Sequence, residues 1–335
     1  MCHMVKLCHR STMDLSIIIV NWNAAHYLIK CVESIRASVR DLTYEIIIVD
    51  NCSTTADRDY LRSKLENCTL ISSQENLGFA RANNIGFRAS IGEFTLFLNP
   101  DTEIIGSAIN QLVEQIKKLP SAGIVGCKLL NSDMSVQLSS IQKFPTIANQ
   151  VLDAKILRTL WPRCRLWDVS PLFKATKSVA RVEVISGACM LLNRVVFQDI
   201  GMFGEDYFMY CEDVELCYRS HLAGFINYYI GSVTIIHHGG KSSSQQDVSC
   251  WATTMRYRAM SHLLRKTRGR FYGVIYRLAM AGTAMGRLLM LGIAFVFGNV
   301  LGHEKSLRPS IAKWLTILRW AVVPERHDYV EGVSA

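Results

Sequence analysis

Short runs of consecutive apolar residues alternate with longer segments of helical periodicity over the first 130 residues. Uninterrupted apolar runs are typical of strands buried on both faces, whereas apolar residues three and four apart mark one face of a helix. Strands joined by helices form a parallel sheet. The pattern therefore predicts an α/β fold with a doubly wound, mostly parallel sheet, with strands at 16–20, 45–49, 69–72, 94–98 and 123–127 and helices at 24–38, 57–66, 78–90 and 104–118.

The regular alternation ends near residue 130. Residues 131–180 carry three prolines among aromatic side chains, and we interpret them as a long insertion over the site. Core strands are predicted again at 187–192 and 233–236. The expected domains are an N-terminal extension at 1–14, an α/β domain at 15–250 with halves at 15–127 and 128–250, and a helical tail at 251–335.

Polar residues follow three of the predicted strands, namely Asn21, Asp50 and Asp101. Ligands of open α/β sheets bind at the carboxyl ends of the strands. Asp101 could hold a divalent cation on a diphosphate, or it could cap the following helix. Asp50 could accept a hydrogen bond from a uracil or thymine ring, or it could cap its own turn.

Two further clusters carry candidate chemistry. Glu212 and Asp213 lie among apolar and aromatic residues, where burial would raise a carboxyl pKa and suit a general base, although adjacent acids are more often a solvated helix face. His237 and His238 follow a predicted strand. An imidazole there suits Mn²⁺ or a phosphate, and the alternative is an ordinary loop histidine.

The net charge of +9 lies entirely in residues 251–335, which hold thirteen Lys or Arg and four Asp or Glu. Apolar segments at 271–302 and 311–323 accompany the charge, interrupted by Arg277 and Arg287. Nucleic-acid binding would explain the charge but not the apolar residues. We expect this tail to lie on an anionic membrane as an interfacial helix, with its arginines reaching headgroups. The alternative is a helical subdomain packed on the α/β domain or on another copy in an oligomer.

The eleven cysteines are odd in number and irregular in spacing, which favours reduced thiols and a cytoplasmic location. Cys2-His3 and Cys8-His9 lie in the N-terminal extension, where we expect no metal site.

The order of the motifs resembles one family. The chain reads IIIVNWN, EIIIVDNCS, NLGFARANNIGFRAS, GEFTLFLNPDTEI, VISGACMLL, FMYCEDVELCYR and IIHHGGKSS in turn. Over residues 15–245 this is similar to the inverting family 2 glycosyltransferases of the GT-A fold, and within them to bacterial rhamnosyltransferases of cell-surface polysaccharide synthesis.

The resemblance assigns roles to particular residues. No role falls on Thr55, where the family has a second acid. Asp213 corresponds to the catalytic base, with Glu212 beside it. The other matches are Val20, Asn21 and Asp50 at the nucleotide base, Arg81 and Asn84 beside the nucleotide, Asn99 and Asp101 at the D-x-D position, Asp101 and His237 on a metal, and Gly187 and Ala188 near the acceptor.

The implied reaction is a single displacement with inversion. The base deprotonates an acceptor hydroxyl, and Mg²⁺ or Mn²⁺ balances the departing nucleoside diphosphate. The preferred donor is dTDP-rhamnose, with UDP-sugars open, and the acceptor is a glycan or a lipid-linked glycan. The enzyme is expected on the inner face of the bacterial cell membrane.

Two alternatives stay open. A sugar nucleotidyltransferase would share the sheet but needs a Gly-rich, basic loop after the first strand, where this chain has Asn21-Trp22-Asn23-Ala24. An inactive membrane-bound scaffold would share the fold without the acids, and here the acids are present.

Overall fold

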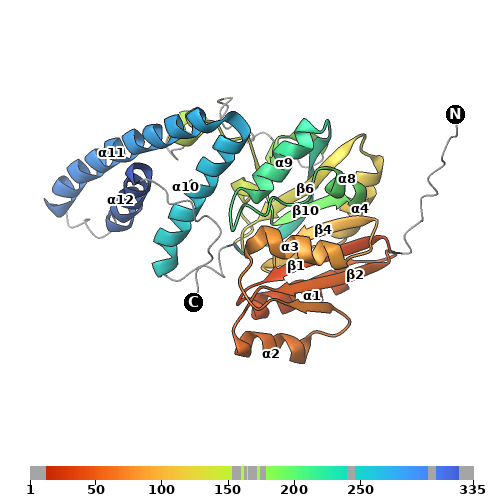
Figure 1. Cartoon of the computed structure of the whole chain (residues 1–335). Coiled ribbons are helices and arrows are strands. Elements are labelled where there is room, and N and C mark those ends of the chain that lie inside the picture. Colours follow the sequence, from red (N-terminus) through yellow and green to blue (C-terminus); the bar gives the residue numbers. More distant parts are fainter. Residues whose placement is uncertain are drawn as a thin grey trace.

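The computed structural model describes residues 13–152, 160–161, 164, 172–173, 179–239, 246–300 and 307–323. A mixed sheet of nine strands forms its centre, in the order β3-β2-β1-β4-β10-β6-β11-β5, with β8 paired to β11 (Figure 1). The strands that pair in parallel are β1 (Leu15–Asn21), β2 (Tyr44–Asp50), β3 (Thr69–Ser72), β4 (Phe94–Leu98), and β6 (Ala122–Leu130) with β11 (Ile226–His237).

Three strands run against this direction. They are β5 (Thr102–Ile104) and β8 (Val179–Val182), each beside β11, and β10 (Cys189–Asn193), which lies between β4 and β6. A separate pair joins β7 (Ile141–Gln142) to β9 (Val184–Ile185). The sheet is therefore mostly parallel, as predicted, but interrupted near its middle by one antiparallel strand.

Helices cover both faces of the sheet because alternate residues of each strand point to opposite sides. Ile17 and Ile19 of β1 join the core under one set of helices, whereas Ile18 joins the core under the other. The first set is α1 (Ala25–Ser38), α2 (Thr55–Lys64) and α4 (Ala108–Lys118), and the second is α3 (Gly78–Ala89), α8 (Arg194–Asp199) and α9 (Glu212–Leu222).

The first 130 residues follow the predicted alternation closely, with two differences. Helix α2 begins at Thr55 rather than at 57, because the Thr54 hydroxyl caps it. The predicted helix at 104–118 is preceded by strand β5, and helix α4 begins at Ala108. Three residues are too few for a periodic signal, and β5 forms only because β11 supplies a partner.

The predicted insertion at 131–180 is only partly described. It contains a short 3-10 turn (Leu138–Ser140), strand β7 and helix α5 (Ile147–Val151), while residues 153–159, 162–163, 165–171 and 174–178 lie outside the described part. The nine cysteines within the described ranges are all free, and Cys2 and Cys8 lie outside them.

The tail forms helices α10 (Gln246–Arg268), α11 (Arg270–Val300) and α12 (Arg308–Val322). Ala259 and Leu263 of α10 are buried in the same core as Phe203 and Tyr207. Helices α11 and α12 pack on the far side of α10 around a core of their own (Figure 1). The expected boundary at residue 251 therefore falls inside a helix that belongs to both parts.

Candidate active site

The carboxyl ends of β1 and β2 place Asn21 opposite Asp50. The Asn21 amide donates to Asp50 Oδ1 at 3.1 Å and to Ser53 Oγ at 3.0 Å. Both residues are fully buried, and Asp50 Oδ2 has no hydrogen-bond partner in the structure. Leaving a buried carboxylate oxygen without a hydrogen bond costs free energy. Asp50 Oδ2 is therefore suited to accept a hydrogen bond from a ligand, such as the ring N–H of a pyrimidine base.

Asp57 completes this cluster, and the sequence alone did not single it out. Its carboxylate accepts from the Asn21 amide at 2.8 Å and from the Ala25 backbone N–H at 3.0 Å. Asp57 lies two residues after Thr55 and brings its carboxylate into the cluster from the first turn of α2. Val20 lies beside it, packed with Val49 and Ala82.

Asp101 and His237 meet at the neighbouring strand ends. His237 Nε2 lies 3.2 Å from Asp101 Oδ1 and 3.2 Å from the Asn99 amide nitrogen. The other ring nitrogen, Nδ1, lies 2.8 Å from Gln137 Oε1. His238 turns away to Ser132 and Glu103, so His237 is the histidine that shares the site with Asp101.

This donor set fits a divalent cation that is completed by its substrate. Gln137 Oε1 can only accept, so Nδ1 of His237 carries the proton and Nε2 keeps its lone pair toward Asp101. Within the described ranges no group of three or more His, Cys, Asp or Glu side chains gathers for a metal. Two protein ligands suit Mg²⁺ or Mn²⁺ when phosphate oxygens and water fill the remaining positions.

The acidic pair begins helix α9. Tyr210 and Cys211, just before it, both have left-handed backbone conformations, with φ of 71° and 66°. Such conformations cost free energy for residues other than glycine and are concentrated at functional sites. Glu212 is buried, while the half-buried Asp213 accepts from the Gly187 N–H at 2.9 Å and from the Val214 N–H at 2.8 Å.

The surroundings act differently on the pKa values of the two acids. Burial and the adjacent Asp213 raise the pKa of Glu212 to about 8, and its Oε2 has no partner. Burial also raises the pKa of Asp213, but the N–H groups of Gly187 and Val214 and the charge of Arg256 oppose this rise. Glu212 therefore holds its proton at neutral pH, whereas the two N–H groups favour the charged form of Asp213.

One short turn joins the Asn99-Pro100-Asp101 segment to the acidic pair Glu212 and Asp213. Gly187 donates to Asp213, and the next residue, Ala188, accepts from the Asn99 N–H at 3.1 Å. The two residues that the resemblance placed near the acceptor therefore lie between the acid pair and the start of the Asn99-Pro100-Asp101 segment.

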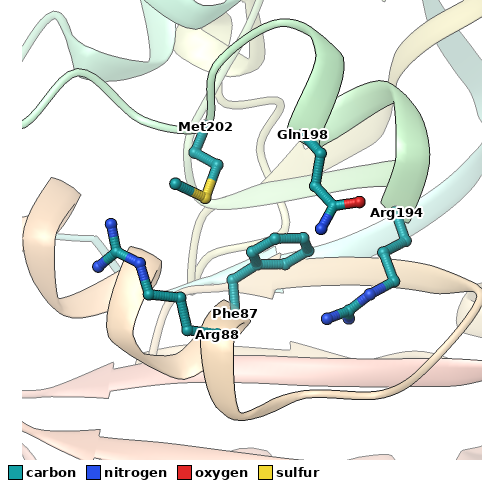
Figure 2. Close-up of a pocket in the computed structure, with 5 residues that line it drawn as sticks. All are labelled: Phe87, Arg88, Arg194, Gln198 and Met202. Atoms are coloured by element: carbon teal, nitrogen blue, oxygen red, sulfur yellow. The ribbon is translucent and has the colours of Figure 1, made fainter.

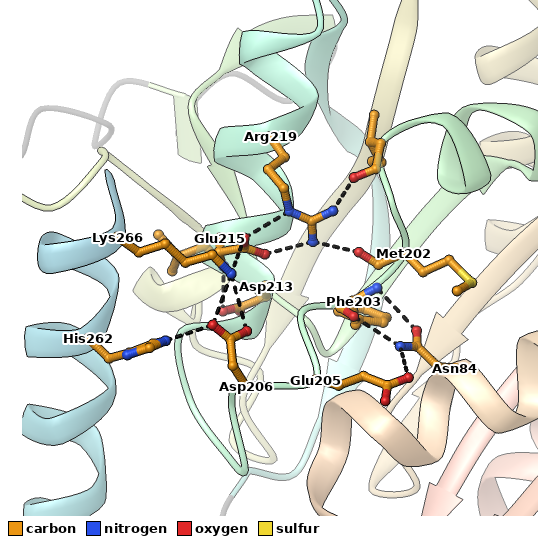
Figure 3. A network of polar contacts seen from close by, with 12 residues as sticks. Asn84, Met202, Phe203, Glu205, Asp206, Asp213, Glu215, Arg219, His262 and Lys266 are labelled. Carbon is orange, nitrogen blue, oxygen red and sulfur yellow. Dashed lines mark hydrogen bonds and ion pairs between the residues drawn. The ribbon is translucent and has the colours of Figure 1, made fainter. Parts of the chain in front are cut away.

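The side chain of Asn84 forms hydrogen bonds with the loop before α9. Its amide donates to Phe203 O and Glu205 Oε1, and its oxygen accepts from the Phe203 N–H (Figure 3). Arg81 reaches the backbone of Glu205 at 3.4 Å. In this structure both residues hold the loop in place, and contact between either of them and a donor remains a prediction.

Helix α10 secures the same loop from the other side (Figure 3). Asp206 accepts from His262 at 2.7 Å and from Lys266 at 3.0 Å, and Lys266 also pairs with Glu215 of α9 at 3.1 Å. Burial would raise the pKa of Asp206, but the hydrogen bonds from His262 and Lys266 and the charge of Lys266 outweigh it and hold that pKa below its usual range. The tail thus directly supports the loop that precedes α9.

A separate hollow of about 360 Å³ lies between α3 and α8. Figure 2 shows Phe87 at its centre, between Arg88 and Arg194. The Arg194 N–H bonds to Glu93 O, just before β4 begins, so this hollow lies at the end of β4 opposite Asn99. It contains none of the predicted site residues.

The fold and these strand-end side chains define an enzyme of the GT-A type. The family described as Glycosyl transferase family 2 matches residues 16–201, and the chain belongs to it.

Two relatives and one solved structure illustrate the likeness. An N-acetylglucosaminyl-diphospho-decaprenol L-rhamnosyltransferase of Mycobacterium tuberculosis is 28% identical over 61% of this chain and 69% of its own. Rhamnosyltransferase WbbL of Escherichia coli is 26% identical over 74% of this chain and 94% of its own. A mannosyltransferase of Pyrobaculum calidifontis, solved with GDP-Man and Mn²⁺, is 16% identical with a TM-score of 0.57 over 93% of this chain and 87% of its own, which supports the fold alone.

We predict that Glu212→Gln flattens the dependence of stability on pH. A carboxyl group whose pKa is higher in the folded chain stabilises it below the unfolded pKa, and this contribution is lost as pH rises through the folded pKa. The wild type should therefore lose stability from about pH 4.5 to about pH 8. Thermal unfolding at pH 5 and pH 8.5 measures this, with Glu33→Gln on an exposed helix face as control. Equal pH dependence in wild type and Glu212→Gln would contradict the assignment.

We predict that Asp101→Ala removes Mn²⁺ binding in the presence of a nucleoside diphosphate, because it takes away the only charged ligand that we assign to the cation. Titration of Mn²⁺ followed by electron paramagnetic resonance measures the bound fraction. Glu103→Ala, two residues away and half exposed, is the matched control and should bind as the wild type does. Unchanged binding by Asp101→Ala would move the cation elsewhere.

Proposed function

We propose that the protein transfers a sugar from a nucleotide-sugar donor to a glycan or lipid-linked glycan with inversion, and that the donor is dTDP-rhamnose. The observation that carries this proposal is the placement of Asp213. Its carboxylate accepts a hydrogen bond from the Gly187 N–H. The carbonyl of the next residue, Ala188, accepts one from the Asn99 N–H, two residues before Asp101. A base and a diphosphate site at one sheet edge suit glycosyl transfer.

In this reaction Asp213 takes the proton of the acceptor hydroxyl as its oxygen attacks the anomeric carbon. The bond from that carbon to the donor phosphate oxygen breaks, and the nucleoside diphosphate leaves. A divalent cation on Asp101 and His237 would neutralise its charge. Asp213 is suited to the proton transfer because its pKa is raised toward neutral pH while it stays accessible.

Two observations support the choice of donor. The partnerless Asp50 Oδ2 matches the ring N–H that thymine and uracil share. Two relatives carry rhamnosyltransferase in their names, and one of these names a diphospho-decaprenol acceptor. The family membership and the intact acids weigh against a nucleotidyltransferase and an inactive scaffold.

Purified protein tested with a panel of nucleotide sugars should release dTDP from dTDP-rhamnose faster than nucleoside diphosphate from the UDP- and GDP-sugars. Asp213→Asn should lower transfer by about 10²–10⁴-fold, because an amide cannot take the proton. Donor binding by the variant should stay near that of the wild type, and Asp199→Asn at the end of α8 serves as control. Release of pyrophosphate, or full activity in Asp213→Asn, would reject the mechanism.

We also propose that α11 attaches the enzyme to the cytoplasmic face of a membrane. Within the described residues one helix is long and apolar enough to cross a bilayer, Arg270–Phe295, with a mean hydropathy of 1.6 and 11% of its most apolar window buried. Its exposed apolar side chains include Phe271, Val274, Leu278, Met285, Leu289 and Ile293.

The two arginines within α11 do not interrupt this face. Arg277 donates to the carbonyls of Trp320 and Val323 at the end of α12, and Arg287 lies 4.7 Å from the Trp314 ring centroid. The expectation that both reach headgroups therefore fails, since α12 attracts them. The exposed side of α11 is left free to enter the apolar part of a membrane.

We predict that Leu278→Glu with Leu289→Glu releases the protein from anionic liposomes. The two side chains are 67% and 68% exposed, and burying a leucine contributes about 1.5–3 kcal/mol. Loss of both should weaken binding at least tenfold in a flotation assay. Leu222→Glu on α9, also 67% exposed, is the matched control. Wild-type flotation by the double variant would reject membrane attachment through α11.

A further inference from the structure

A wide groove separates α10 from α12, on the side of α10 that faces away from the sheet. Its volume is about 1040 Å³, and its walls are mainly apolar. The lining residues that matter here are Trp251 and Arg258 of α10 and Leu315, Leu318, Arg319 and Val322 of α12. None of them belongs to the site described above.

The two arginines of this groove are Arg258 of α10 and Arg319 of α12. Neither guanidinium makes a hydrogen bond or an ion pair with any residue in the described part of the chain, and Arg258 Nε is buried without an acceptor. Leaving the buried Arg258 Nε without an acceptor costs free energy unless a ligand satisfies it, whereas Arg319 is exposed and available to a ligand. Planar guanidinium groups match phosphate oxygens, so the groove is suited to a phosphate or a diphosphate.

The apolar lining of the rest of the groove is suited to bind a hydrocarbon chain. Leu315 is 53% exposed and Val322 is 62% exposed, although both line a cavity rather than a convex surface. Apolar surface that stays open in a concave site gains free energy when an apolar ligand covers it. A ligand that combines a phosphate with an apolar chain would satisfy both parts of the groove at once.

One end of the groove touches the active-site loop. The Trp251 ring packs edge-on against Phe208, with ring centroids 6.3 Å apart. Phe208 stands five residues before Asp213 on the loop that leads into α9. The neighbouring turn of α10 places the Arg256 guanidinium 5.5 Å from the Tyr210 ring centroid, on the same loop. A ligand in the groove can therefore extend past Trp251 toward the proposed base.

We infer that this groove binds the phosphorylated lipid of a lipid-linked acceptor. Arg258 and Arg319 hold its phosphates, the apolar side chains of α12 hold the first part of its chain, and the sugar that it carries reaches Asp213 past Trp251 and Phe208. The inference rests on the proposed function for its choice of acceptor. It extends that function by naming the residues that recognise the lipid.

Farnesyl diphosphate is a suitable probe, because it carries a diphosphate and an isoprenoid chain but no sugar. Binding to the full chain in nonionic detergent is measured by equilibrium dialysis. The wild type should bind saturably, and Arg258→Gln with Arg319→Gln should bind at least about tenfold more weakly, since neutral amides replace both charged donors to the phosphates. Arg270→Gln is the matched control, an exposed tail arginine that lies outside the groove.

Three outcomes would overturn the inference. One is equal binding of farnesyl diphosphate by the double variant and the wild type. Another is competition by inorganic pyrophosphate as strong as that by farnesyl diphosphate, which would indicate an anion site only. The third is equal competition by farnesol, which would remove the role of the arginines.

Hydrolysis of the sugar donor separates this inference from the proposed function. The double variant should hydrolyse donor at the wild-type rate, because neither arginine belongs to the donor site. If the wild type bound farnesyl diphosphate but hydrolysed no nucleotide sugar, the proposed function would fail and the lipid site would stand.

Discussion

The active site depends on one antiparallel strand inserted into a parallel sheet. Because β10 runs against β4, the residues that precede it, Gly187 and Ala188, lie at the edge where β4 ends. Ala188 binds the Asn99 N–H there, and Gly187 binds Asp213. A parallel strand in the same place would begin at the opposite edge of the sheet, and the acidic pair would lose its connection to Asn99 and Asp101.

The adjacent acids Glu212 and Asp213 do not both have to carry a negative charge. Glu212 is buried beside Asp213 and keeps its proton, since two adjacent buried carboxylates cannot both ionise cheaply. The N–H groups at the start of α9 and at Gly187 favour the charged form of Asp213. Asp101 is separated from this pair and shares its edge with a histidine whose orientation Gln137 sets. In the proposed reaction, proton transfer and the neutralisation of phosphate charge are tasks of different carboxylates.

Helix α10 connects the tail to the loop that leads into the acidic pair. On one side His262 and Lys266 bind Asp206 in the loop before the acidic pair, and on the other side the helix forms a wall of the groove shared with α12. The left-handed residues Tyr210 and Cys211 lie in the same loop, and strained backbone persists only where surrounding contacts enforce it. The contacts of His262 and Lys266 with Asp206 are among those that hold this loop.

The sequence by itself determined the parallel half of the sheet and the polar residues at its strand ends, because buried strands and amphipathic helices leave local periodic patterns. It also determined Asp101, His237 and the acidic pair as candidates, through motifs that are contiguous in the chain. Only the tertiary structure decided the direction of β10, the twelve-residue length of β11, the entry of Asp57 into the cluster of Asn21 and Asp50, and the placement of Arg258 and Arg319 in one groove between α10 and α12. Each of these depends on a partner distant in sequence, and the partner's position follows from the packing of the whole chain rather than from any local pattern.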